Sequence, residues 1–106
     1  MYGVRFEWDE AKNLANKRKH GISFEEASHV FFDPLHVVVE DRVLDGEQRW
    51  QALGVVKRNA GSLILLLVAH TIRDESKTDG YVEVVRIISA RKATPEERRV
   101  YEVENG

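Results

Sequence analysis

Cationic side chains near the end of the chain carry the clearest chemical signal. Arg86 falls on an apolar strand pattern over residues 82–88, and Arg91 and Lys92 follow at the end of that pattern. An arginine that is buried needs an anionic partner, and its guanidinium group matches a phosphate well. Arg86 therefore either binds a phosphate or forms a salt bridge with one of the chain's own carboxylates. A regular strand would point Arg86 and Arg91 to opposite faces, so they share one site only if the chain bends near residues 89–90.

Cleavage of RNA without a metal ion needs three kinds of group. A base must approach the 2′-hydroxyl, cations must surround the phosphorus, and an acid must protonate the 5′-oxygen that leaves. The candidates for catalysis are Lys19, His20, Arg86 and Arg91. The candidates for substrate binding are Trp8, Arg49, His70, Lys92 and Tyr101. Alternatively, His70 caps the end of a buried strand and Tyr101 belongs to the core.

Other classes of reaction lack the residues that they need. The chain has no cysteine, which excludes disulfides, thiolate metal sites and a cysteine nucleophile. Its four histidines are not spaced as metal-binding pairs, and it has no phosphate-binding loop, dinucleotide-binding glycine motif or serine elbow. We therefore expect neither a metal site nor a cofactor.

Length and composition indicate one globular domain over residues 1–106, with 42% hydrophobic and 32% charged residues. The net charge is −2, but acidic residues concentrate at positions 25–47, whereas cations cluster at 17–20, 57–58 and 91–99. A basic face could therefore meet nucleic acid, although most charge runs are simply solvated surface. The longest apolar run is too short to cross a bilayer, and the N-terminus does not resemble a signal peptide, so we expect a cytoplasmic protein without a membrane partner.

Capping patterns in the sequence predict three helices, which would position the candidate residues. Asp9 suits the N-cap of a helix that runs through Lys19. The apolar stripe expected to face the core from this helix consists of Ala11, Leu14 and Ala15. Ser23 begins a capping box for a second, shorter helix, and Thr94 with Glu97 does so for a third.

Strands are expected where apolar or alternating runs lie between turn signals. These runs are residues 35–41, 49–56, 63–69 and 82–88, with a loose edge strand at 2–8. The polar residues 73–80 are expected to form a long, disordered hairpin loop. The predicted fold class is α+β, an antiparallel four-stranded meander, optionally with the N-terminal edge strand, packed with two N-terminal helices and one C-terminal helix.

Three ordered sets of residues form one signature along the chain. The first set is Phe6-Glu7-Trp8-Asp9, Lys12, Asn16 and Lys19-His20-Gly21-Ile22-Ser23-Phe24-Glu25-Glu26-Ala27. The second set is Asp33-Pro34, Glu47-Gln48-Arg49-Trp50 and Leu53-Gly54. The third set is Arg86-Ile87-Ile88-Ser89-Ala90-Arg91-Lys92-Ala93-Thr94, Glu97-Arg98 and Tyr101. In this order, and over almost the whole chain, the sets resemble the BrnT toxins; residues 72–81 depart from the pattern, being longer than the usual hairpin.

The resemblance implies a RelE-like fold and a ribonuclease toxin of a type II toxin–antitoxin pair. It also implies a BrnA-type antitoxin, a ribbon-helix-helix-like DNA-binding protein that neutralises the toxin and holds it at operator DNA. Our leading hypothesis is a metal-independent endoribonuclease that cleaves RNA and inhibits translation. The alternative is a non-catalytic subunit that binds the antitoxin and contributes to autoregulatory operator binding.

Overall fold

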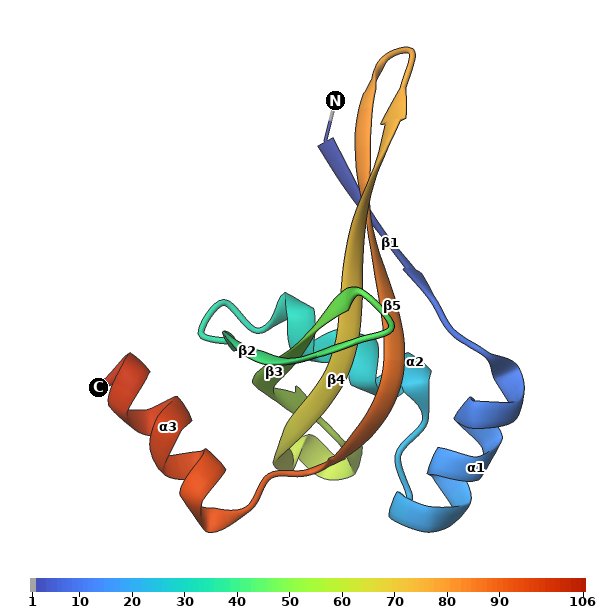
Figure 1. Cartoon of the computed structure of the whole chain (residues 1–106). Coiled ribbons are helices and arrows are strands. Elements are labelled where there is room, and N and C mark those ends of the chain that lie inside the picture. The colour runs from blue at the N-terminus through green and yellow to red at the C-terminus, as the bar shows by residue number, and fades with distance from the viewer. Residues whose placement is uncertain (1) are drawn as a thin grey trace.

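A five-stranded mixed sheet forms the centre of the fold (Figure 1). The computed structural model describes residues 2–106. The strands are β1 (Tyr2–Glu7), β2 (Val37–Leu44), β3 (Glu47–Lys57), β4 (Leu63–Lys77) and β5 (Gly80–Lys92). The helices are α1 (Glu10–His20), α2 (Phe24–Ser28) and α3 (Pro95–Asn105), with short 3-10 turns η1 (His29–Phe32) and η2 (Asn59–Gly61).

The strand order in the sheet is β1-β5-β4-β3-β2. Strands β2 to β5 pair antiparallel with their neighbours in sequence, whereas β1 pairs parallel with β5. The α+β class is thus confirmed, but the sheet is mixed and has five strands. The N-terminal segment is a full strand, because Glu7 pairs with Arg86 and the register continues back to Tyr2.

The prediction of a disordered loop over residues 73–80 is wrong. Strands β4 and β5 continue as a long twisted hairpin beyond the other strands, and the chain turns at Thr78 and Asp79 (Figure 1). Arg73 and Glu75 of this segment form salt bridges with charged residues of β1 on the same face. The polar residues of this segment therefore form ion pairs between strands. Sequence composition alone does not distinguish a polar strand of this kind from a polar loop.

Three helix starts follow the predicted caps. The Asp9 carboxylate accepts a hydrogen bond from the backbone N–H of Lys12 at 3.2 Å. The Ser23 hydroxyl accepts one from the N–H of Glu26 at 3.1 Å. Thr94 and Glu97 form the complete capping box. The three N-caps are confirmed, as expected for signals that act within one helical turn. The capping box predicted at Ser23 is only half formed, because the Glu26 carboxylate accepts hydrogen bonds from Arg58.

The predicted apolar stripe of α1 is wrong. Leu14 is 50% exposed, and Ala11 and Ala15 are exposed as well. The buried residue of α1 is Asn16, whose amide donates to the carbonyl groups of Ile22 and Ala90 at 2.9 and 2.8 Å. Its oxygen accepts the N–H of Ala90 at 3.2 Å. A buried amide with several partners thus docks this helix in place of apolar packing.

The core fills the space between one face of the sheet and the segment of α2 and η1. Its buried members are Ile22, Phe24, Ala27, Val30, Ala52, Val56, Leu66, Val68, Val85, Ile87 and Ala90. Helix α3 lies against β3, on the other side of the sheet in Figure 1. We call the sheet face opposite the core the open face.

Candidate functional site

A β-bulge in β5 decides which face its arginines occupy. Between the residues that pair with Ala69 and His70 of β4, β5 contains one extra residue, Ile88. An extra residue shifts the alternation of side chains by one position. Arg86 and Arg91, five positions apart, therefore both point to the open face. This bulge provides the bend that the sequence analysis required.

The two arginines occupy the open face at separate points. Arg86 pairs with Thr71, and Arg91 pairs with Leu67, four residues away on β4. At a rise of about 3.3 Å per residue, their strand positions are roughly 13 Å apart. They can therefore contact different phosphates of one strand, but they do not converge on one atom.

A row of side chains crosses the open face at the level of Arg86. Glu7 of β1 pairs with Arg86, which pairs with Thr71. Arg49 of β3 completes the row, because the residue that follows it pairs with His70. With strands about 4.8 Å apart, Arg49 lies roughly 10 Å from Arg86 across Thr71. The row thus places a carboxylate at one end and guanidinium groups beyond it.

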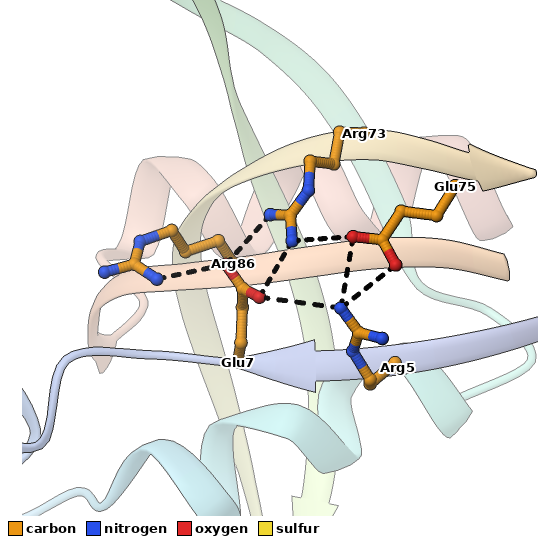
Figure 2. A network of polar contacts seen from close by, with 5 residues as sticks. All are labelled: Arg5, Glu7, Arg73, Glu75 and Arg86. Carbon is orange, nitrogen blue, oxygen red and sulfur yellow. Dashed lines mark hydrogen bonds and ion pairs between the residues drawn. The ribbon is translucent and has the colours of Figure 1, made fainter.

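Glu7 forms the centre of an ion-pair network on this face (Figure 2). Its carboxylate accepts hydrogen bonds from Arg73 at 2.9 and 3.0 Å and from Nη1 of Arg86 at 3.0 Å. Glu75 bridges Arg73 at 3.0 Å and Arg5 at 3.2 Å. Figure 2 shows Arg86 approaching Glu7 from the side away from Arg5 and Glu75. The salt-bridge interpretation of Arg86 is therefore confirmed, with Glu7 as the partner.

The network makes Glu7 a stronger acid. Hydrogen bonds from Arg73, and then the one from Arg86, lower the pKa of Glu7 to about 2, although partial desolvation acts in the opposite direction. Glu7 is consequently ionised at physiological pH and is a weak base while the arginines hold it. The side chains of Arg5, Arg73 and Arg86 are between 44% and 46% exposed. An external phosphate can therefore reach them and compete with the carboxylates.

Arg91 connects the end of β5 to the first turn of α3. Its guanidinium group makes two hydrogen bonds of 2.8 Å to the carboxylate of Glu97. Those bonds, with the backbone N–H of Thr94, lower the pKa of Glu97 to about 2. Arg91 thus also has a carboxylate partner within the chain, and the pair orients α3 relative to the sheet.

Tyr101 connects a later turn of α3 to Asp33, which follows η1. Its hydroxyl donates a hydrogen bond of 2.6 Å to Asp33, and burial together with this bond raises the pKa of Tyr101 to about 12. The buried Asp33 also accepts the backbone N–H groups of Leu35 and Val55 at 2.9 Å. Burial opposes the ionisation of Asp33, but these hydrogen bonds lower its pKa overall. Tyr101 therefore supports α3, and its phenol is not free for proton transfer.

The structure does not bring Lys19 and His20 to Arg86. Both residues lie in the last turn of α1, and α1 docks on the core side of β5 through Asn16 and Ala90. Arg86 points to the opposite face. The sequence could not show on which face of the sheet Lys19 and His20 lie, because the position of α1 relative to β5 depends on tertiary contacts.

Trp8 and His70 also lie on the core side. The Trp8 ring packs edge-on against Phe24 at 6.2 Å between ring centroids, and its indole N–H donates to Glu10. His70 is fully buried, with its ring perpendicular to Phe31 at 4.9 Å. Burial lowers the pKa of His70, so the imidazole is neutral. We assign His70 to the core, since it has no surface that RNA could contact.

Sequence reasoning missed Glu7 and Arg73 as site residues. Arg5 and Glu7 alternate on one strand, and Arg73 and Glu75 alternate on another, so each strand presents charge at every second position. That alternation was an available sign of one charged sheet face. The contact between Glu7 and Arg73 could not be predicted from the sequence, because the two residues are 66 positions apart.

Two further features concern membranes and metals. Within residues 2–106, no helix is long and apolar enough to cross a membrane. In the same part of the chain, no group of three or more histidine, aspartate or glutamate side chains is arranged to hold a metal ion.

Comparison with known proteins agrees with the signature in the sequence. Residues 8–97 match the family model of the ribonuclease toxin BrnT of type II toxin–antitoxin systems. No curated protein matches the chain. The matched stretch includes α1, α2, strands β2 to β5 and the first turn of α3. Membership of this family supports a toxin role and implies an antitoxin partner. The chain belongs to the BrnT family of ribonuclease toxins.

Proposed function

We propose that the chain is a metal-independent endoribonuclease whose reaction site is the open face around Glu7. The observation that supports this most is the Glu7 carboxylate held between Arg73 and Arg86 at 2.9 to 3.0 Å on an exposed face. A carboxylate that can act as base, beside cations that can bind a phosphate, supplies the groups needed for attack by a 2′-hydroxyl.

The reaction begins when an RNA phosphate replaces Glu7 as the partner of Arg73 and Arg86. Loss of these hydrogen bonds raises the pKa of Glu7 from about 2 toward its ordinary value of 4.5. The carboxylate then accepts the proton of the 2′-hydroxyl, whose oxygen attacks the adjacent phosphorus. The bond from phosphorus to the 5′-oxygen breaks, and this oxygen takes a proton from water. The protonated Glu7 then gives its proton to the hydroxide that remains, which restores the carboxylate. The products are a 2′,3′-cyclic phosphate and a 5′-hydroxyl.

The remaining candidates take different places in this proposal. Arg49 lies in the row of Arg86, and Arg91 lies further along the same face, so both would contact neighbouring phosphates. We leave Lys19 and His20 out of the reaction because they lie on the other side of the sheet. Tyr101 supports the helix that carries the Arg91 partner.

We further propose a RelE-like fold, action in the cytoplasm, and inhibition of translation through cleavage of RNA. A BrnA-type antitoxin would neutralise the chain by covering the open face and would bring it to operator DNA. The exposed guanidinium groups there would favour an antitoxin segment that carries carboxylates. A complex that contacts only the acidic residues 25–47 would contradict this arrangement.

Incubation of the purified chain with total RNA in EDTA tests the proposal. We expect wild type to cleave RNA and the double variant Arg73→Ala, Arg86→Ala to lose cleavage. A control variant, Arg42→Ala, Arg99→Ala, removes the same charge from exposed positions and should cleave normally. If wild type fails to cleave, even with ribosomes added, the non-catalytic antitoxin-binding subunit becomes the better assignment. The pairing of Arg86 and Arg91 with carboxylates of the chain is the observation that favours this second function.

A further inference from the structure

A second cationic region lies where β5 leads into α3. A cleft of about 380 Å³ opens there between the turn from β3 to β4 and the start of α3. Its walls carry the cationic side chains of Arg58, Lys92 and Arg98, and its lining includes no aspartate or glutamate. Leu63, which is 65% exposed, forms an apolar part of the lining.

The cations of this cleft differ in how they are held. Arg58 is fixed by Glu26 at 2.6 and 2.8 Å and by the carbonyl of Gly21 at 3.0 Å. The side chains of Lys92 and Arg98 form no hydrogen bond or ion pair with the part of the chain that the structure describes, and both are exposed. The positive charges of Lys92 and Arg98 have no carboxylate partner, so they raise the local electrostatic potential and favour binding of an external anion.

The lining indicates which anion fits. A simple inorganic anion would use the cations but not the exposed Leu63 beside them. Single-stranded RNA offers phosphates for Lys92 and Arg98, together with ribose and base surfaces for an apolar side chain. Arg58 also lines a second, larger cleft of about 650 Å³, whose lining includes Glu25 and Glu26 and is therefore less suited to a phosphate.

The cleft lies at the end of the sheet and is lined from both of its faces. Leu65, two residues from the Arg91 partner Leu67, belongs to the open face, whereas Lys92 pairs with the core residue Leu66 and points to the core side. Arg86 pairs with Thr71 of β4, whereas Leu65, six residues away on the same strand, lines the cleft. Six residues at about 3.3 Å place the cleft roughly 20 Å from Arg86 along the strand, beyond Arg91, and an RNA strand reaches Lys92 by passing round the end of β5. A stacked strand at about 3.4 Å per nucleotide would cover this distance with roughly six nucleotides.

We propose that Lys92 and Arg98, beside Arg58, form a second phosphate-binding subsite for the RNA strand, several nucleotides from the bond that is cut. This inference rests on the proposed function for the location of that bond. The subsite provides affinity and orients the strand, whereas the network around Glu7 provides the chemistry.

Binding of RNA that cannot be cleaved tests the subsite separately from catalysis. The probe is a 2′-O-methyl oligouridine of about 12 nucleotides, titrated over a range of salt concentrations. For single strands, each phosphate contact contributes about 0.7 to the slope of log affinity against log salt concentration. We expect the variant Lys92→Ala, Arg98→Ala to reduce this slope by about 1.4. The charge-matched variant Arg42→Ala, Arg99→Ala should keep the wild-type slope.

Cleavage of substrates of two lengths provides a second measurement. The Lys92→Ala, Arg98→Ala variant should lower kcat/KM about 10-fold or more for a substrate of about 12 nucleotides. It should leave kcat/KM unchanged for a trinucleotide, which is too short to reach the cleft.

The outcomes separate this inference from the proposed function. Equal salt slopes for the two double variants would overturn the subsite. Unchanged RNA binding with loss of a complex with an acidic protein would also overturn it and assign the cleft to a protein partner. If wild type cleaves no RNA but the slopes differ as expected, the proposed function fails while the RNA-binding subsite stands.

Discussion

The two cationic regions of the molecule differ in what balances their charge. On the open face, Arg5, Arg73 and Arg86 share the carboxylates of Glu7 and Glu75 (Figure 2). In the cleft before α3, the exposed cations have no carboxylate in the lining. The first region is therefore oriented before any ligand arrives, whereas the second attracts an anion without having to release a partner.

This difference separates the tasks that the two regions suit. In the network, a phosphate must displace Glu7, and the displacement frees the carboxylate to act as a base. In the cleft, no group can accept a proton from a 2′-hydroxyl, so binding there leads to no reaction. A catalytic site of this kind needs a carboxylate base in contact with cations that bind the phosphate. A subsite that only increases affinity for RNA needs the cations alone.

The largest effect should follow from removing the base alone. Glu7→Gln keeps the shape of the side chain but cannot accept the proton, so kcat/KM for RNA cleavage should fall about 10²- to 10⁴-fold. Binding of uncleavable RNA at the cleft should stay at the wild-type level. Glu75→Gln is the matched control within the network and should have a much smaller effect. Equal losses for the two variants would show that the network is important only for structure.

Removing the buried amide of α1 should loosen the strand that joins the two regions. Ala90 lies on β5 between Arg86 and Lys92, and Asn16 bonds both its N–H and its carbonyl. Asn16→Ala leaves these groups unpaired, and we expect the free energy of unfolding to fall by about 3 kcal/mol in a urea titration. Leu14→Ala, at an exposed position of the same helix, should change it by about 0.5 kcal/mol or less. Similar values for both variants would contradict docking through Asn16.

Loosening α3 should affect the cleft and spare the network. Tyr101→Phe removes the hydrogen bond to Asp33, and we expect a loss of about 1.5 kcal/mol in the free energy of unfolding. Because α3 carries Arg98, binding of the 12-nucleotide probe should weaken. Cleavage of a trinucleotide should not change, and a parallel loss there would show that the two regions are not independent.

Acid should weaken two ion pairs over the same pH range, that of Glu7 in the network and that of Glu97 at the start of α3. The pKa values of Glu7 and Glu97 are about 2 in the folded chain, below the ordinary value of 4.5. Because these pKa values are lowered by folding, their contribution is complete above about pH 4.5 and is lost as the pH falls toward 2. Both carboxylates are partly solvated, so we expect about 1 kcal/mol from each. Unfolding titrations between about pH 5 and pH 2 should show this loss in wild type and less of it in Glu7→Gln.

The cleft variant gives the contrasting result in the same titration. Lys92→Ala, Arg98→Ala should have the pH profile of wild type, since neither cation has a carboxylate partner among the described residues. A flattened profile for this variant would show that its charges interact with Glu97 over a longer range.

The sequence by itself determined the local features of this protein. Asp9, Ser23 and Thr94 each cap the helix that follows, because a cap and its partner lie within three residues of one another. The apolar runs predicted the positions of the strands, and the ordered motifs indicated the protein family. The arginines were recognisable as candidates for phosphate binding from residue type alone.

Only the tertiary structure decided which of these residues meet. The bulge at Ile88 turned Arg86 and Arg91 to one face, and docking of α1 kept Lys19 and His20 on the other. Glu7 meets Arg86 across 79 positions of sequence, a contact that exists because β1 adds to the edge of β5. Local sequence patterns record the preferences of neighbouring residues, whereas strand register and helix docking depend on the packing of the whole sheet.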